Sequence, residues 1–287
     1  MRVQYLFSSR RTRRIAKIRK QRQKYPDISH KIVTVSDIIL EVLDARFIKE
    51  TRNIELETEI KKQKKKLIYV LNKSDLVKTK KVPKNFTSYV FISCELRKGI
   101  KELRDLIKME AKKVEKKVNK IIKGDKIKDS EDNKIVVGII GYPNTGKSSL
   151  INLLVGKNVA GTAAEAGFTK NIQKLRLTND IVLLDSPGVI PEKEYSGVNR
   201  EKIAVHAIAG GRSYSQVKDP DQVIANIIIE YPDVLEKYYN IDAKGNSEFL
   251  VNELGKQKGY LKKGGEVDDD KVSRLILKEW QEGKIKI

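Results

Sequence analysis

Short apolar runs alternate with amphipathic stretches between about residues 33 and 189 of the chain. The runs are rich in β-branched residues and mostly unbroken, which is typical of strands buried on both faces of a parallel sheet. The stretches between them carry apolar residues at helical spacing, as do Ile100, Leu103, Ile107, Val114 and Val118. The pattern predicts an α/β fold, a mostly parallel sheet with helices on both faces. We expect its strands at Ile38–Leu43, Leu67–Leu71, Tyr89–Ile92, Ile135–Ile140 and Ile181–Leu184.

Helical periodicity continues beyond Gly188, where the strand pattern stops. Asp219 and Pro220 are suited to open a helix, because proline fits the first helical position, and Pro232 follows the expected end. Ser247 and Asp268 could cap two further helices. The sequence therefore predicts a small helical domain after the sheet domain.

We expect three parts along the chain. A basic N-terminal arm covers residues 1–28, the sheet domain covers 29–213, and the helical domain covers 214–287. A polar segment at 124–133 reads as a linker inside the sheet domain.

Charge points to a polyanionic partner. Lys and Arg number 59 against 38 Asp and Glu, a formal net charge of +21, and no acidic residue precedes Asp27. Such a surplus favours nucleic acid as the partner over a merely solvated basic surface. For the basic arm, the alternative to an RNA-binding segment is a mobile tail.

A single cysteine excludes a disulfide framework or a four-thiolate zinc site within the chain. With no apolar run of signal-peptide or membrane-spanning length, we expect a cytoplasmic protein without membrane contact.

A phosphate-binding motif stands at Gly141–Ser148, which matches G-x-x-x-x-G-K-[ST]. A predicted strand leads into it and a helix opens at Ser148, whereas a plain glycine-rich turn would need neither. The glycines let backbone N–H groups face phosphate oxygens, Lys147 would neutralise phosphate charge, and Ser148 would ligate Mg²⁺.

Asp185 and Gly188 belong to a second phosphate-site element, which ends the next strand. Asp185 would hold the Mg²⁺ shell and the Gly188 N–H would sense the γ-phosphate. The loop Gly161–Thr169 between the two elements is suited to a switch, with Thr169 as the candidate metal ligand and Thr162 as its alternative.

Guanine specificity is indicated by Asn72-Lys73-Ser74-Asp75, directly after a predicted strand. The Asp75 carboxylate can accept two N–H bonds that guanine offers and adenine cannot. Asn72 can donate to N7, and Lys73 can lay its stem over the base. Ser93-Cys94-Glu95 follows another strand, where a backbone N–H near Cys94 could meet the guanine carbonyl. Cys94 fits as a small residue rather than a reactive thiol.

These elements resemble the GTPase signature in a rotated order, because the guanine elements precede the P-loop. Chain termini that lie close together permit such a circular permutation. The predicted nucleotide-binding residues are Asn72, Lys73, Asp75, Ser93, Cys94, Glu95, Asn144, Thr145, Gly146, Lys147, Ser148, Ser149, Asp185 and Gly188. Lys147, Thr169 and Gly188 are the candidate catalytic residues, and Ser148, Thr169 and Asp185 the candidate Mg²⁺ ligands.

The permuted order resembles the YlqF/RbgA-type family of ribosome-assembly GTPases. Leu43-Asp44-Ala45-Arg46 is similar to its D-A-R element and Gly167–Lys170 to its switch, and segments from Gly255 to Ile285 resemble its helical C-terminal domain. The resemblance implies a Mg²⁺-dependent enzyme that hydrolyses GTP to GDP, a monomer off the ribosome that binds large-subunit rRNA and is released after hydrolysis.

Two details of the resemblance concern catalysis. Asn144 matches a P-loop asparagine that binds potassium in related GTPases, which implies potassium-stimulated turnover. No catalytic histidine can be carried over, since His30 and His206 are the only histidines and are expected to be structural. An apolar Val189 stands where many GTPases place a water-orienting glutamine.

Three other functions compete with a timer of large-subunit assembly. A small-subunit assembly GTPase would be expected to carry an additional β or zinc module. A nucleotide-gated RNA-binding scaffold, with incidental hydrolysis, is kept open by Val189. A metabolic P-loop kinase would leave Asn72 and Asp75 without a role.

Overall fold

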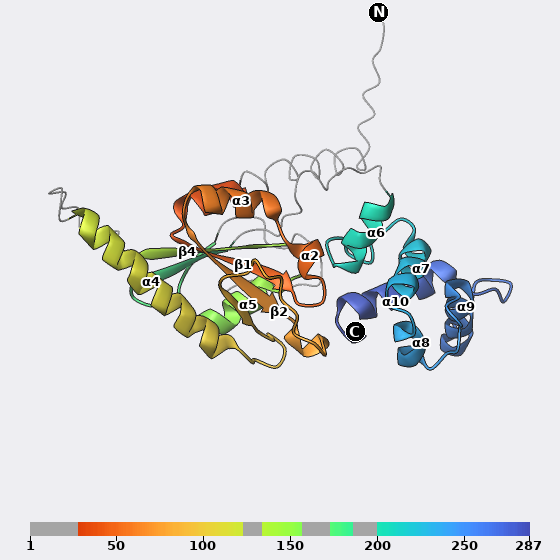
Figure 1. The fold of residues 1–287 in the computed structure, drawn as a ribbon. Coiled ribbons are helices and arrows are strands. Elements are labelled where there is room, and N and C mark those ends of the chain that lie inside the picture. The colour runs from red at the N-terminus through yellow and green to blue at the C-terminus, as the bar shows by residue number, and fades with distance from the viewer. Residues whose placement is uncertain (1–27, 123–133, 157–172, 186–199) are drawn as a thin grey trace, which may run out of the picture.

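A computed structural model describes residues 28–122, 134–156, 173–185 and 200–287. The described chain forms two lobes, one built around a β-sheet and one made of helices at the C-terminal end (Figure 1). The predicted arm up to residue 27, the 124–133 linker and the Gly161–Thr169 switch lie outside the described residues.

The sheet has six strands in the order β3-β2-β1-β4-β6-β5. Neighbouring strands are parallel except for β5, which pairs antiparallel with β6 at one edge. The strand that leads into the P-loop, β4, lies between β1 and β6, so the elements before it in sequence form one half of the sheet. This order confirms the predicted circularly permuted sheet. The strands are β1 (Ile38–Asp44), β2 (Lys66–Asn72), β3 (Tyr89–Phe91), β4 (Ile135–Gly141), β5 (Gln173–Arg176) and β6 (Ile181–Asp185).

All five predicted strands are present, and β5 is an addition that the apolar pattern missed. Only Leu175 is a large apolar residue in this edge strand, so its sequence lacks the signal of a buried strand. In contrast, every residue of β1 is buried.

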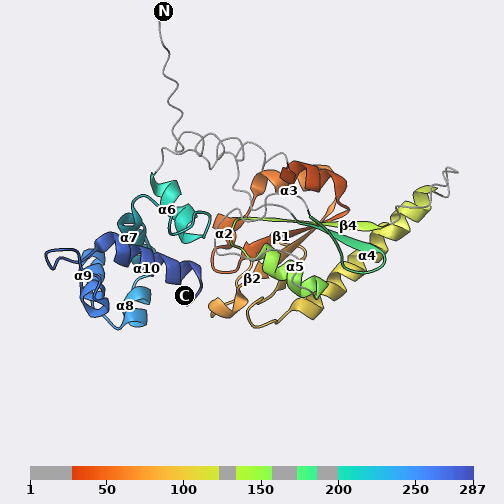
Figure 2. The ribbon, with the colours of Figure 1, turned by 180° about the vertical axis from the view of Figure 1, so that it is seen from behind.

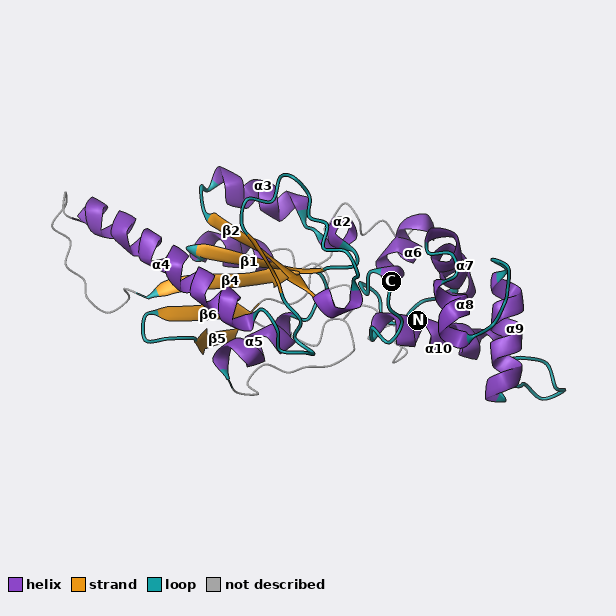
Figure 3. Cartoon of the chain, turned by 60° about the horizontal axis from the view of Figure 1, so that its bottom comes forward, coloured by secondary structure: helices purple, strands orange, loops and turns teal. Residues whose placement is uncertain are grey.

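Helices cover both faces of the sheet, as predicted. On one face, α4 (Ile100–Ile122) and α5 (Lys147–Val155) pack residues such as Leu103 and Leu150 against the strands. On the other, α3 (Ile54–Lys62) and a helical segment at residues 28–35 pack around Ile39 and Ile140. Figures 1 and 3 show α3 and α4 on opposite sides of the sheet.

The C-terminal lobe has its own apolar core, centred on the buried Trp280. Its helices are α6 (Arg200–Ile208), α7 (Pro220–Glu230), α8 (Val234–Tyr239), α9 (Ser247–Lys258) and α10 (Asp269–Gln281). Pro220 opens α7 as expected, and the Asp268 carboxylate caps α10 by accepting from the Lys271 N–H at 3.2 Å. The proposed Ser247 cap is wrong. Asn246 caps α9 instead, because its Oδ1 accepts from the Phe249 N–H at 3.0 Å.

Phe47, in the turn after β1, packs against the helical lobe. Its ring lies 6.0 Å from that of Trp280 and 6.3 Å from that of Tyr231, so a sheet-lobe side chain belongs to the helical core. That core extends back to Ala204 in α6. The predicted boundary between residues 213 and 214 stays a prediction. Figure 2 shows α6, α7 and α10 beyond one end of the sheet, opposite the end past which α4 projects.

Candidate nucleotide-binding site

The P-loop joins the end of β4 to the start of α5. Gly146 precedes the helix with φ +93°, a left-handed conformation that favours glycine. A Cβ at Gly146 would lie 2.2 Å from Asn72 Nδ2, and one at Gly141 would lie 2.4 Å from the Val42 carbonyl oxygen. Both glycines are therefore required by the close approach of β1 and β2, which bring the guanine-type loop against the P-loop.

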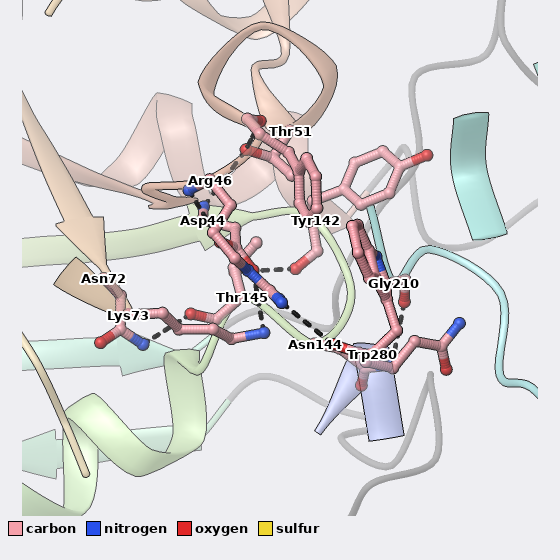
Figure 4. A network of polar contacts seen from close by, with 12 residues as sticks. Asp44, Arg46, Thr51, Asn72, Lys73, Tyr142, Asn144, Thr145, Gly210 and Trp280 are labelled. Atoms are coloured by element: carbon pink, nitrogen blue, oxygen red, sulfur yellow. Dashed lines mark hydrogen bonds and ion pairs between the residues drawn. The ribbon is translucent and has the colours of Figure 1, made fainter. Parts of the chain in front are cut away.

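Asn72 holds three segments of the site together. Its Nδ2 donates to the Thr145 carbonyl in the P-loop at 2.7 Å (Figure 4). Its Oδ1 accepts from the Cys94 N–H at 3.1 Å. The Asn72 side chain is buried, so these bonds are shielded from water. The three motifs, more than 50 residues apart in places, converge at the carboxyl ends of the strands.

Asp75 lies in a short 3-10 turn, Ser74–Leu76, immediately after Lys73, which adopts a left-handed φ of 61°. The Asp75 Oδ1 atom is buried and accepts no hydrogen bond from the described residues. Such an acceptor costs free energy unless a ligand or water supplies a donor. The position of Asp75 Oδ1 therefore fits a ligand that presents N–H groups.

A cavity of about 680 Å³ lies beside these groups. This volume is in the range of small-molecule and cofactor sites. From the sheet lobe it is lined by Asn72, Lys73, Asp75, Leu76, Cys94, Glu95, Asn144, Gly146 and Ser149. Residues from both predicted half-sites, the guanine-type loop and the P-loop, therefore face one space.

Ser93 and Thr145 are buried and do not line the cavity, but they hydrogen-bond the backbone of the loops that do. Ser93 Oγ accepts from the Leu96 N–H at 3.0 Å, and Thr145 Oγ1 donates to the Tyr142 carbonyl at 2.9 Å. Burial raises the pKa of the neighbouring Cys94 thiol to about 12, so it stays protonated near neutral pH. This agrees with the interpretation of Cys94 as a small packing residue.

Lys147 is the buried cation of the P-loop. Its Nζ donates to the Tyr142 carbonyl at 2.8 Å. Burial lowers its pKa to about 8, and the negative charge of Asp185 opposes that shift. An additional anion in the site would restore the ordinary pKa, because it favours the charged ammonium.

Mg²⁺ prefers oxygen ligands, which Ser148 and Asp185 would supply. Ser148 lies in the first turn of α5, and Asp185, fully buried, ends β6 beside β4. The donor chemistry fits Mg²⁺. The other predicted phosphate-site residues, Thr169 and Gly188, lie outside the described residues, as does Val189.

A buried ionic network at Asp44 was not predicted from the sequence, although the D-A-R element contains it. Arg46 binds both carboxylate oxygens, with Nε to Oδ1 at 3.0 Å and Nη2 to Oδ2 at 2.8 Å, and Lys73 Nζ lies 2.9 Å from Oδ2. Burial alone would raise the pKa of Asp44, but the charges of Lys73 and Arg46 outweigh it and hold the pKa well below its ordinary value. The Lys73 ammonium is thereby fixed while its stem lines the cavity.

The two histidines make structural contacts. His206 is buried, and its ring stacks on Tyr142 of the P-loop and bonds the Tyr142 hydroxyl. His30 bonds Glu59 at the surface.

Together, a P-loop on the central strand, a guanine-type loop before it in sequence and this strand order define a circularly permuted P-loop GTPase domain, here followed by a helical lobe.

Comparisons with known proteins agree. The model of the 50S ribosome-binding GTPase family matches residues 136–243. An uncharacterised GTP-binding protein of Methanocaldococcus jannaschii is 39% identical over 90% of this chain and 65% of its own. Nucleolar GTP-binding protein 2 of Pneumocystis carinii is 33% identical over 89% of this chain and 51% of its own. The chain thus spans less than two thirds of the length of these relatives.

The solved structure of nucleotide-bound YlqF from Thermotoga maritima has the same fold. It covers 92% of this chain and 95% of its own, with a TM-score of 0.61 at 22% identity. In fold the chain is similar to the circularly permuted GTPase YlqF, and in sequence it is similar to GTP-binding proteins.

None of the described helices is both long and apolar enough to cross a membrane.

Proposed function

We propose that this protein binds GTP and GDP through the cavity between the P-loop and the guanine-type loop. The observation that carries the proposal is the buried Asp75 Oδ1, which accepts no hydrogen bond within the described part of the chain and lies in a cavity that P-loop residues also line. Guanine offers the N1–H and the 2-amino group to one carboxylate, whereas adenine does not. Asn72 and Cys94 line the same cavity as Asp75. Asn72 Nδ2 donates one proton to the Thr145 carbonyl and would donate the other to guanine N7, while the Cys94 N–H is already bonded to Asn72 Oδ1.

Hydrolysis of GTP to GDP and phosphate would rest on Lys147, Thr169 and Gly188. The Lys147 ammonium would stabilise charge on the β- and γ-phosphates, and its lowered pKa would rise again in their presence. Ser148, Asp185 and Thr169 would hold Mg²⁺, which supplies electrostatic stabilisation of the phosphates when bound. The Gly188 N–H would contact the γ-phosphate.

Turnover should depend on potassium through Asn144. Its Nδ2 donates to the Gly210 carbonyl at 2.9 Å, which leaves the carbonyl oxygen Oδ1 to bind a cation. We expect hydrolysis roughly tenfold faster in potassium than in sodium at equal ionic strength, about 1.4 kcal/mol of barrier. In Asn144→Ala the two rates should become equal. GTP affinity is measured in both salts, because this substitution also removes the Gly210 bond. Equal wild-type rates in the two salts would remove the ion from the mechanism.

We further propose that the protein acts as a cytoplasmic timer in large ribosomal subunit assembly, binding rRNA as a monomer. Its net charge of +21 supports a polyanionic partner. The matching family model is described as a 50S ribosome-binding GTPase, and the fungal relative is named as nucleolar.

The partner proposal makes different predictions for the arm and for the nucleotide. Deleting residues 1–25 should weaken binding to both ribosomal subunits and flatten the salt dependence, because phosphate contacts release counterions from any RNA. The preference for the large subunit should survive this deletion. Replacing a non-hydrolysable GTP analogue with GDP should instead abolish the preference, since the switch loses its γ-phosphate and Mg²⁺ anchor.

Sedimentation with purified large and small subunits, in each nucleotide and at several salt concentrations, measures both effects. If the protein pellets equally with either subunit in both nucleotides, a generic RNA-binding scaffold replaces the assembly role. A preference for the small subunit would favour the small-subunit alternative.

A further inference from the structure

The cavity that contains Asp75 is closed on one side by the helical lobe. Tyr214 and four consecutive residues that begin at the last residue of α10, Gln281, Glu282, Gly283 and Lys284, line the same space as Asn72 and Asp75. These two sets of residues come from different lobes and are more than 130 residues apart in the sequence. A ligand that fills the cavity from the Asp75 side therefore reaches the helical lobe.

The wall formed by residues 281–284 is held firmly within its own lobe. Gln281 Nε2 donates to the carbonyls of Ala207 and Arg212 at 2.7 and 2.8 Å, and its Oε1 accepts from the Tyr214 N–H at 3.1 Å. These three bonds tie the end of α10 to the segment around Tyr214.

The same wall touches the guanine-type loop directly. Gly283 ends the helix with a φ of +78°, and a Cβ added there would lie 2.6 Å from Leu76 Cδ1. Leu76 immediately follows Asp75 and also lines the cavity. The turn therefore packs against the loop that carries the predicted guanine acceptor.

Two hydrogen bonds beside the cavity dock the lobes. Arg46, which is held by the Asp44 carboxylate, donates through Nη1 to the Trp280 carbonyl at 2.9 Å. Asn144 in the P-loop donates to the Gly210 carbonyl at 2.9 Å (Figure 4). The first bond starts from the Asp44 network, which also holds Lys73 of the guanine-type loop, and the second starts from the P-loop. The position of the helical lobe therefore depends on groups linked to the proposed nucleotide site.

We propose that the turn at residues 281–284 contacts the guanosine end of bound nucleotide and closes the cavity over it, so that release requires this turn to move away from Leu76. The proposal rests on the guanine site proposed above. A contact made only in the bound state slows dissociation, and by reciprocity bound nucleotide strengthens the docking of the helical lobe.

The test uses the full chain and measures the dissociation rate constant of radiolabelled GDP by filter binding, with excess unlabelled GDP as the chase. Lys284 is a lining residue with an exposed side chain, and its Nζ pairs with Glu282 at 3.0 Å. We expect Lys284→Ala to release GDP roughly 3- to 10-fold faster than wild type, an effect expected in dissociation rather than association. Lys286→Ala removes the same charge two residues further on, outside the cavity lining, and should leave the rate unchanged.

Gly283→Ala is the second variant. A Cβ at this positive φ would lie 2.6 Å from Leu76 Cδ1, so it would push the turn away from Leu76 and should also speed release. Failure of the wild type to bind guanine nucleotides would reject the proposed function itself. If the wild type binds GDP while Lys284→Ala and Gly283→Ala release it at the wild-type rate, the guanine site stands and the closing turn is rejected. Equal acceleration by Lys284→Ala and Lys286→Ala would also reject it, since the effect would then be one of net charge.

Discussion

Replacing Asp75 with asparagine should lower the affinity for GTP by roughly 2–4 kcal/mol and raise the affinity for xanthosine triphosphate. The carboxylate accepts N–H bonds, and an amide can present a donor where guanine also presents donors. Xanthine carries an oxygen in place of the 2-amino group, so it can accept from the new amide. The Oδ1 atom of Asp75 has no hydrogen bond to satisfy it among the described residues, and the substitution therefore breaks no bond of the described structure there.

Calorimetric titration with GTP, xanthosine triphosphate and ATP measures this change. Asp105→Asn, an exposed carboxylate on α4, is the matched control and should bind GTP as the wild type does. Urea unfolding should show similar stability for the wild type and both variants. An unchanged GTP affinity in Asp75→Asn would remove Asp75 from the base site and, with it, the argument for guanine over adenine.

The strands were predictable because a parallel sheet buries both faces of each strand. Runs such as Ile38–Leu43 and Ile135–Ile140 carry that requirement in their own residues. The short edge strand β5 does not, since an antiparallel edge needs few apolar side chains. The cap of α9 was missed by one residue because both Asn246 and Ser247 have suitable side chains, and only the backbone geometry selects between them.

The site was predictable as far as its motifs are local. Gly146, Asn72 and Asp75 lie in short segments whose chemistry is visible in sequence, and the structure brings these segments to one cavity. The contribution of the helical lobe could not be predicted, because the contact of Gly283 with Leu76 depends on how two lobes dock. The role of Arg46 could not be predicted either. Its D-A-R motif is visible in the sequence, but its bond to the Trp280 carbonyl joins positions 234 residues apart and depends on the same docking of the lobes.

Asp44→Asn should destabilise the fold by roughly 3–5 kcal/mol at pH 7, the usual cost of breaking a buried ion pair by removing one partner. The side chains of Asp44 and Arg46 are only 1% and 2% exposed, so the guanidinium would lose its counter-charge without gaining water. An amide can keep one hydrogen bond to Arg46 but cannot balance its charge. The released Arg46 would also hold the Trp280 carbonyl less firmly, which weakens the docking of the helical lobe.

The stability difference between wild type and Asp44→Asn should depend on pH. The charges of Lys73 and Arg46 outweigh the effect of burial and lower the folded-state pKa of Asp44. The stability that the ionised Asp44 contributes is therefore complete above its unfolded pKa of about 3.9. It is lost as the pH falls from there toward the folded-state pKa. The stability difference between wild type and Asp44→Asn should thus be constant from pH 5 to 7 and shrink below about pH 4. Urea unfolding followed by the fluorescence of Trp280, the single tryptophan, measures it, with Asp105→Asn as the exposed control. A difference below about 1 kcal/mol at pH 7, or one that grows as the pH falls, would show that the Asp44 network does not hold the two lobes as described.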